Sequence, residues 1–316
     1  MRKREMKRLM AMVGHLTLLQ RRGLMAELAA AERKAASVEV IEGRIHGGAT
    51  CPHCAGDRIV RNGSADGLQR YKCRACGRTF NALTGTPLAR LRQKGKWITQ
   101  AQALRDGMSI KEASTRLHVA RSTAFRWRHR FLDLPRTVQA QSLVGIAEAD
   151  ETYFLHSNKG QRGLSRKPRK RGGKAGKRGL SKEQVPVLVA RDRSGGTANF
   201  ILPADDKVSV VAALKPILAA DTILCTDGSG MLAAAAKEMG ITHRPVNLAA
   251  GRRVVAGVYH VQNVNAFDAR LKGWMQRFHG VATRYLSNYL GWFRALDRSP
   301  GSKPEPASLL ALAAGM

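Results

Sequence analysis

The spacing of apolar residues predicts a helical N-terminal part and a C-terminal part in which strands and helices alternate. Residues 1–46 are rich in Ala, Leu and Glu and read as helices, as do residues 96–132. From about residue 143, short apolar runs alternate with helical segments, which predicts an α/β domain. The expected strands are 144–149, 185–190, 199–202 and 222–226, and the expected helices are 207–219, 231–239, 260–277 and 283–297. Pro and Gly residues from Ser299 onward predict a loose tail over 299–316.

The sequence predicts no membrane span, because no stretch of 18 apolar residues occurs. Basic residues followed by the apolar stretch 9–19 imitate the start of a secretory signal. Arg21 and Arg22 follow at once, however, and no small-residue cleavage site comes after the apolar stretch. We read this segment as an amphipathic helix and expect a cytoplasmic protein that works without a membrane.

The charge of the chain favours a polyanionic partner. Lys and Arg number 54 against 23 Asp and Glu, which leaves a net charge of +31. Such an excess opposes compaction unless a polyanion relieves the repulsion, and nucleic acid fits better than an anionic membrane surface. Residues 159–182 carry 11 basic residues and no acidic one, whereas the rest of 141–316 is nearly neutral. We expect this basic loop to bind DNA and to order on binding, with these residues among its contacts: Lys167, Arg169, Lys170 and Arg171.

Four of the five cysteines form two Cys-x-x-Cys pairs, Cys51 with Cys54 and Cys73 with Cys76. The 18 residues between the pairs suit two tight loops that surround one tetrahedral ion with four thiolates. A redox dithiol or four unrelated thiols are the alternatives. The spacing favours one Zn²⁺ with a structural role, because four thiolates leave no open position for catalysis. The segment between the pairs reads as a hairpin, so residues 47–90 are predicted to form a zinc ribbon.

Residues 91–138 show the pattern of a helix-turn-helix. Ser109 and Glu112 form a capping box at the start of the first helix, a short turn covers 118–121, and Ser122 is the expected N-cap of the second helix. An ordinary helical hairpin is the alternative, but the second helix is basic away from its apolar stripe, which favours DNA binding. Its expected DNA contacts are Arg121, Thr123, Arg126, Arg128 and Arg130.

Two acidic residues lie where predicted strands end. Asp150 follows the apolar run that begins at Val144, and Asp227 follows the run 222–226. A single Asp at such a place is usually a turn residue, but the carboxyl ends of strands in α/β sheets are also where sites form. Two carboxylates that converge there would bind Mg²⁺ or Mn²⁺. In a protein built to bind DNA, this pair predicts metal-dependent phosphoryl transfer.

The helix expected at 260–277 contributes a third set of polar residues. Asn265 and Lys272 lie together at the edge of its apolar stripe, and Asp268 lies between that edge and the centre of the stripe. An Asn carbonyl oxygen can bind a metal ion without adding charge, and Lys272 is placed to meet a DNA phosphate. The stripe itself consists of Val264, Phe267, Leu271, Trp274, Met275 and Phe278.

Together these motifs resemble the ISXO-like DDE superfamily of bacterial insertion-sequence transposases, also called the IS-fifteen-ninety-five group. The resemblance covers about residues 45 to 297, and the combination of motifs is far more specific than any one of them. The matching stretches are Cys51-Pro-His-Cys54, residues 69–88 around Cys73 and Cys76, Glu148-Ala-Asp-Glu-Thr-Tyr-Phe154, Cys225-Thr-Asp-Gly228, and His260-Val-Gln-Asn-Val-Asn265 through 280–286.

The resemblance implies an RNase H-like catalytic domain over 141–298, in which the first and fourth strands are neighbours and bring Asp150 and Asp227 together. It further implies a DDE triad whose third position is Asn265, where Glu is usual, with Lys272 as an additional catalytic residue. Asp268 or Glu151 could supply the missing charge, although strand alternation puts Glu151 on the face opposite Asp150.

The implied activity is DNA transposition. Two Mg²⁺ or Mn²⁺ ions held by Asp150, Asp227 and Asn265 would activate water to cut a phosphodiester bond at each element end, and the freed 3′-OH would attack target DNA. Because two ends must be held, we expect a homodimer or larger synaptic complex on double-stranded DNA, associated with the bacterial nucleoid. No covalent protein–DNA bond is needed, so Tyr153 and Tyr259 are not expected to act as nucleophiles.

Two other functions stay open. A catalytically inactive regulator, or a decayed transposase in which Asn265 marks the loss, would bind element ends without cutting them. An RNase H-like nuclease would cut DNA without joining it. Cleavage and strand-transfer assays on the terminal inverted repeats separate these possibilities from a transposase.

Overall fold

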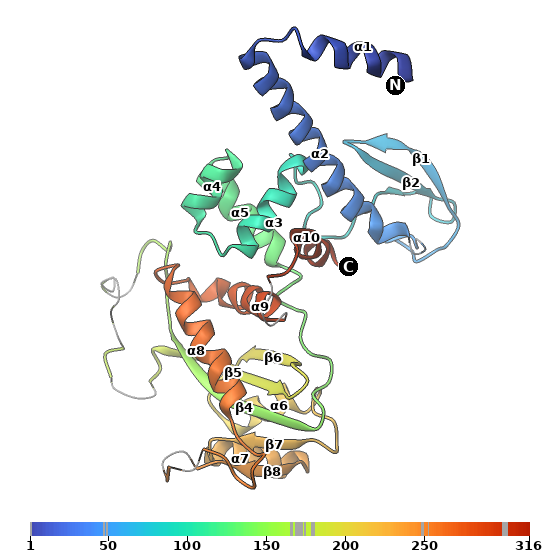
Figure 1. The fold of residues 1–316 in the computed structure, drawn as a ribbon. Coiled ribbons are helices and arrows are strands. Elements are labelled where there is room, and N and C mark those ends of the chain that lie inside the picture. Colours follow the sequence, from blue (N-terminus) through green and yellow to red (C-terminus); the bar gives the residue numbers. More distant parts are fainter. Residues whose placement is uncertain are drawn as a thin grey trace. The chain divides into compact units, whose positions relative to one another are not determined.

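The structure of this 316-residue chain is a computed structural model that describes residues 2–46, 48, 50–164, 167, 173, 175–177, 181–247, 250–251, 253–298 and 303–316. The chain forms two compact units (Figure 1). The first comprises Met1–Phe131 together with Pro304–Met316, and the second comprises Leu132–Lys303. Among the helices of these described residues, none combines the length and the apolar character that crossing a bilayer requires.

The first unit opens with the helices predicted for residues 1–46, which are α1 (Lys3–Val13) and α2 (Leu18–His46). A three-stranded antiparallel sheet follows, formed by β1 (Ile59–Ala65), β2 (Leu68–Cys73) and β3 (Thr79–Phe80). The pairing of β1 with β2 confirms the hairpin predicted between the two cysteine pairs.

Three helices then form the region predicted as a helix-turn-helix. They are α3 (Trp97–Arg105), preceded by the short 3-10 helix η1 (Lys94–Lys96), α4 (Ile110–Leu117) and α5 (Arg121–Leu132). The capping box is confirmed, because Ser109 Oγ accepts a hydrogen bond from the Glu112 N–H (3.3 Å) and the Glu112 carboxylate accepts one from the Ser109 N–H (2.7 Å). The prediction of Ser122 as an N-cap is wrong, since α5 begins at Arg121 and already includes this residue.

The C-terminal residues differ from the predicted loose tail. The helix α10 (Pro306–Ala314) packs against α2 and α3, and Leu310, Ala313 and Ala314 are fully buried. Local pattern did not reveal this contact, because the surfaces that bury α10 lie more than 200 residues earlier in the chain.

The second unit is built on a five-stranded sheet with the strand order β6-β5-β4-β7-β8. The strand β4 pairs antiparallel with β5 and parallel with β7, which in turn pairs parallel with β8. This sheet confirms the predicted α/β character, although the edge strand β8 was not predicted. The strands are β4 (Ile146–Leu155), β5 (Gln184–Asp192), β6 (Thr197–Ile201), β7 (Ile223–Thr226) and β8 (Thr242–Pro245).

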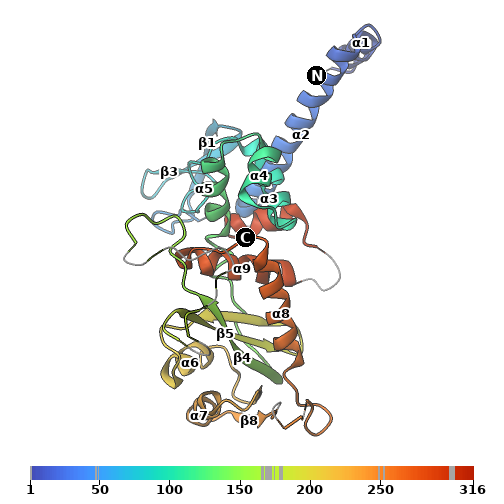
Figure 2. The same cartoon turned by 90° about the vertical axis from the view of Figure 1, so that its left-hand side faces the viewer.

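Helices cover both faces of this sheet (Figures 1 and 2). On one face, α6 (Lys207–Leu214) and α7 (Gly230–Met239) share a core with Ala147 and Ala149 of β4. The other face carries α8 (Gln262–Gln276) and, after the 3-10 helix η2 (Thr283–Tyr285), α9 (Leu286–Asp297). Phe267 of α8 packs edge to ring on Phe293 of α9, with ring centroids 5.1 Å apart.

The strand β4 is longer than predicted, so Asp150 lies in its middle and not at its end. Pairing with β5 continues as far as Leu155, whereas parallel pairing with the short β7 stops at Glu148, opposite Cys225. Asp150 therefore lies where one neighbouring strand has ended and the other continues, which leaves its side of the sheet open to the loop after β7.

Candidate functional site

Asp150 and Asp227 each follow the last pair of two parallel strands. Glu148 of β4 pairs with Cys225 of β7, Asp150 and Asp227 lie two residues further along their chains, and the charge of Asp227 acts on Asp150. Neighbouring strands are about 4.8 Å apart, and residues level with each other in a parallel pair point to the same face. The Asp150 carboxylate also accepts a hydrogen bond from the Glu151 N–H at 2.9 Å.

Burial and neighbouring carboxylates raise the pKa of two acidic residues at this place, Asp150 and Glu151. Burial and the charge of Asp227 raise the pKa of Asp150 to about 6, against the opposing effect of Lys272. Burial and the charges of Asp150, Asp227 and Asp205 raise the pKa of Glu151 to about 7. Burial contributes most to both shifts and the neighbouring carboxylates add to it, and such a group of partly buried carboxylates is suited to bind a cation.

The helix α8 contributes three polar residues spaced one turn apart. Asn265 is partly buried, Asp268 is buried and Lys272 is exposed. The Oδ1 atom of Asp268 has no hydrogen-bond partner among the described residues. Burial and the charge of Asp150 raise the pKa of Asp268 to about 7, while Lys272 opposes this shift. The structure therefore brings Asp268 and Lys272 within electrostatic reach of Asp150.

The carboxylates around Asp150 are spaced more widely than the four cysteines. Within the described part of the chain, the four cysteines alone form a group of three or more candidate ligand atoms that lie within 4.8 Å of one another.

A buried carboxylate fixes the start of α8. Glu148 is fully buried and accepts hydrogen bonds from the backbone N–H groups of Asn263 (2.7 Å) and Val264 (2.9 Å), and from the Asn263 side-chain amide (3.0 Å). Arg193 and His260 also contact this carboxylate, at 3.1 and 3.4 Å. The first N–H groups of a helix have no partner inside it, so Glu148 satisfies them and joins α8 to β4. The sequence singled out Glu148 as part of a matching stretch and did not predict this role.

The other end of α8 is held by the chain that leaves β4. The Lys159 ammonium donates hydrogen bonds to the carbonyl oxygens of Phe278 (3.2 Å) and Gly280 (2.8 Å). The Ser157 N–H donates to Thr283 Oγ1, and the Thr283 N–H donates to the Ser157 carbonyl, both at 2.9 Å. The helix α8 therefore runs alongside β4, from Glu148 at its start to the residues that follow Leu155.

Tyr153 is not activated as a nucleophile. Its hydroxyl donates a hydrogen bond to Asp205 at 3.1 Å. Burial, together with the negative charge of Asp205, raises the pKa of the Tyr153 phenol, so that the hydroxyl stays neutral.

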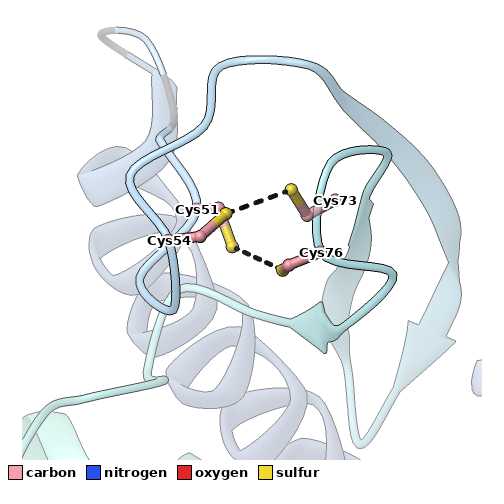
Figure 3. A group of neighbouring side chains, drawn as sticks. All are labelled: Cys51, Cys54, Cys73 and Cys76. Atoms are coloured by element: carbon pink, nitrogen blue, oxygen red, sulfur yellow. Dashed lines mark hydrogen bonds between the residues drawn. The ribbon is translucent and has the colours of Figure 1, made fainter.

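The four cysteines converge in the first unit (Figure 3). The sulfurs of Cys51 and Cys76 are 3.6 Å apart, and those of Cys54 and Cys73 are 3.7 Å apart. A Zn–S bond of about 2.3 Å places the sulfurs of a tetrahedral site about 3.8 Å apart. The arrangement therefore fits one zinc ion, and the four thiols are too far apart to be disulfides.

Equivalent backbone loops hold the two cysteine pairs. The Ala55 N–H donates to the Cys51 carbonyl (2.8 Å), and the Gly77 N–H donates to the Cys73 carbonyl (3.0 Å). Both residues have a positive φ, of 59° and 72°, which folds each loop back after its second cysteine. Hydrogen bonds from the backbone N–H groups of Cys76 and Ala75 lower the pKa of Cys73 to about 7, whereas the Cys76 thiol and burial raise the pKa of Cys54 against a backbone hydrogen bond from Gly56.

The predicted DNA contacts of α5 divide into two groups. Arg121 and Arg126 are exposed and Thr123 is partly exposed. Arg128 is only 2% exposed and donates a hydrogen bond to the Met108 carbonyl, which corrects its prediction as a DNA contact. The reason is that positions 124, 127, 128 and 131 lie on one face of a helix, so Arg128 belongs to the packed side of α5.

Arg130 is also engaged inside the unit. Its guanidinium donates hydrogen bonds to the carbonyl oxygens of Pro87 and Ala89, the latter at 3.0 Å. These bonds tie α5 to the residues that follow the cysteine sheet. Of the predicted loop contacts, Lys167 is exposed, whereas Arg169, Lys170 and Arg171 lie outside the described residues.

Comparison with known proteins places the chain among transposases. Residues 142–294 match the family model of the ISXO2-like transposase domain, and residues 88–135 match that of the homeodomain-like domain. The chain is also 30% identical over 288 residues to a Halobacterium salinarum protein named as an uncharacterized protein in transposable element ISH50. That match covers 86% of this chain and 94% of the relative.

Similarity to solved structures is weaker. A simian T-cell lymphotropic virus intasome in complex with the PP2A regulatory subunit B56 gamma gives a TM-score of 0.30 at 10% identity, covering 67% of this chain and 74% of that chain. A pre-cleavage Mos1 transpososome gives 0.21 at 12% identity, covering 69% and 79%. Scores this low do not establish a shared fold. The match to the ISH50 protein spans nearly the full length of both chains, and on this ground the chain belongs to the ISXO2-like transposase family.

Proposed function

We propose that this protein cuts and joins DNA by metal-dependent phosphoryl transfer at a site centred on Asp150 and Asp227. The observation that carries the proposal is the register of β4 and β7, whose last pair, Glu148 with Cys225, stands two residues before each aspartate in the region that matches the transposase domain. The raised pKa values of Asp150 and Asp268, together with the unpartnered Asp268 oxygen, support a carboxylate site that a cation completes.

The strand order supports an RNase H-like fold for residues 141–298. Three antiparallel strands, β6, β5 and β4, are followed across the sheet by the parallel strands β7 and β8, with helices on both faces. In this arrangement the first strand of the domain, β4, and the fourth, β7, are neighbours, as the sequence resemblance implies.

Asp150, Asp227 and Asn265 are the residues that would hold the metal ions. Two ions of Mg²⁺ or Mn²⁺ bound there would polarise the scissile phosphate and lower the pKa of a bound water. Lys272 is exposed next to this site and is positioned to bind a DNA phosphate. Glu148 keeps the helix that carries Asn265 and Lys272 in place beside β4.

The first unit would supply DNA binding. Cys51, Cys54, Cys73 and Cys76 would hold one structural Zn²⁺. The exposed side of α5, with Arg121, Thr123 and Arg126, would contact the element end, as in other helix-turn-helix proteins. The basic residues 159–182 would bind further phosphates, and a dimer or larger assembly would hold both element ends.

Asp150→Asn and Asp227→Asn test this proposal. Each variant is expected to lose strand cleavage of a duplex that carries the terminal inverted repeats, in Mg²⁺, while it keeps its DNA affinity in a gel-shift titration. Asp221→Asn is the matched control, because Asp221 is exposed in the same unit before β7. Cleavage that persists in both site variants overturns the assignment.

A regulator that binds element ends without cutting them is the second candidate, favoured by Asn265 at the third position. It predicts that the wild-type protein itself gives no cleavage in Mg²⁺ or Mn²⁺. A nuclease would give nicked or cut duplex without strand-transfer products, so the appearance of joined products separates the transposase from both alternatives.

A further inference from the structure

We infer that Asp268 is a third carboxylate of the divalent-metal site, placed beside Asp150 to supply the negative charge that Asn265 does not carry. The inference rests on the proposed function of this site. It adds a ligand that the triad of Asp150, Asp227 and Asn265 does not contain.

The position of α8 along β4 puts Asp268 beside Asp150. The helix is joined to β4 at its start by Glu148, and at its far end by Lys159 and Ser157. Asp150 lies two residues beyond Glu148, or about 7 Å along the strand. Along a helix, about 7 Å corresponds to between four and five residues.

Glu148 binds Asn263 and Val264, and four to five residues beyond them along α8 lies Asp268. Asp268 is therefore as far along α8 as Asp150 is along β4. Asn265 lies only one or two residues beyond the Glu148 contact, or about 3 Å at most. The helix therefore carries a carboxylate at the level of Asp150, and the amide of the expected triad lies nearer to Glu148.

Strand alternation places the side chains on the same side. Glu148 and Asp150 point to the face of β4 that α8 covers. Glu151 points to the opposite face, where Ala147 and Ala149 pack against α6 and α7. Of the two carboxylates that could replace the missing charge, Asp268 is the one that faces Asp150 across the packed surface.

The state of the Asp268 side chain indicates a missing partner. It is 6% exposed, and its Oδ1 atom has no hydrogen-bond partner among the described residues. A buried carboxylate is unfavourable unless it is paired. The negative charge of Asp150 acts on Asp268, and both carboxylates feel the exposed Lys272. A cation bound between the two aspartates would compensate both of them.

Divalent-metal affinity, measured without DNA, tests the inference. The full chain with its zinc bound is titrated with Mn²⁺ and followed by calorimetry and by the EPR signal of free Mn²⁺. Asp268→Asn, which keeps the shape of the side chain, is expected to weaken binding by about 10-fold or more. Asp221→Asn is the control and is expected to bind Mn²⁺ as the wild type does.

Asp150→Asn distinguishes a failure of the role given to Asp268 from a failure of the proposed metal site. If Asp150→Asn loses Mn²⁺ affinity and Asp268→Asn keeps it, the role of Asp268 is overturned while the proposed site stands. If neither variant loses affinity, the proposed site itself is wrong. Adding Asn265→Asp to Asp268→Asn restores a carboxylate one turn away and is expected to recover part of the lost affinity.

Metal-directed cleavage of the wild-type chain tests the inference without relying on a variant that folds. Fe²⁺ bound in place of Mn²⁺ reduces added hydrogen peroxide to hydroxyl radicals, ascorbate returns the iron to Fe²⁺, and the radicals cut the nearby backbone at positions that mass spectrometry locates. Cuts next to Asp150, Asp227 and Asp268 support the inference. Cuts near Asp150 and Asp227 without any around residues 267–269 overturn it.

Discussion

The carboxylate of Glu148, in the middle of the sheet, accepts a hydrogen bond from the backbone N–H of Val264, at the start of α8, at 2.9 Å. The same carboxylate binds Asn263 and lies 3.1 Å from Arg193, with no exposure to solvent. One carboxylate thus serves as the partner of several donor groups. It also sets how far along β4 the polar residues of α8 lie.

Replacing this carboxylate should destabilise the second unit strongly. Glu148→Gln leaves the Arg193 charge without its buried partner, and we expect the free energy of unfolding to fall by about 3 kcal/mol. Urea denaturation measures the change. Glu238→Gln is the control, because Glu238 pairs with Lys207 at the surface and such pairs contribute less than about 1 kcal/mol. Equal losses in the two variants would contradict the role given to Glu148.

The cysteine geometry predicts one zinc ion per chain. Cys73→Ser should abolish zinc binding and unfold the small sheet, since zinc binding and the folding of such sites are coupled. Metal analysis by mass spectrometry gives the zinc content, and circular dichroism reports the loss of structure. Cys225→Ala should keep its zinc, because Cys225 is buried in the other unit. A Cys73→Ser protein with a full zinc content would refute the four-thiolate site.

The raised pKa values predict how stability depends on pH without divalent ions. The pKa of Asp150 is raised to about 6 and that of Asp268 to about 7, so the folded chain keeps protons that the unfolded chain has already released. Stability of the second unit should therefore fall as the pH rises from about 4 to about 7, and level off above that. Urea unfolding in metal-depleted buffers at several pH values checks this.

Asp268→Asn should make that fall shallower. The variant should be more stable than the wild type at pH 8, and the difference should shrink as Asp268 of the wild type becomes protonated. Asp221→Asn should retain the wild-type slope. An Asp268→Asn protein that follows the wild-type curve throughout would show that Asp268 is not a buried, unpartnered carboxylate.

The two groups of arginines on α5 should respond differently to substitution. Arg121→Ala and Arg126→Ala should weaken binding to element ends. Each should also reduce the slope of the logarithm of the binding constant against the logarithm of salt concentration by the amount expected for about one phosphate contact. Fluorescence anisotropy over a series of NaCl concentrations measures both quantities. Arg128→Ala should instead lower thermal stability, because the side chain is buried against the Met108 carbonyl. A stable Arg128→Ala protein that has lost only DNA affinity would reverse this division.

The C-terminal helix should contribute to the core of the first unit. Leu310→Ala removes a fully buried side chain from α10 and should cost about 2–5 kcal/mol of unfolding free energy. Leu19→Ala, at a position that is 81% exposed, should change it by less than about 0.5 kcal/mol. Denaturant titration compares the two, and a neutral Leu310→Ala would mean that α10 is dispensable.

Local sequence was sufficient for features that depend on near neighbours. The capping box of Ser109 and Glu112 joins residues three apart, and each Cys-x-x-Cys pair closes a loop of a few residues. The strands that precede Asp227 and contain Asp150 are short apolar runs whose burial shows in their composition. Such features follow from spacing along the chain, because the interacting groups are always within reach of each other.

Tertiary structure decided everything that depends on which surfaces meet. The length of β4 beyond Asp150 is set by pairing with β5, and the burial of α10 is set by helices near the other end of the chain. Arg128 looks like a DNA contact until the packed side of α5 is known, and the choice between Asp268 and Glu151 stays open until Glu148 fixes where α8 lies. Packing brings together residues that are far apart in sequence, and the role of a charged residue depends on whether packing places a partner beside it.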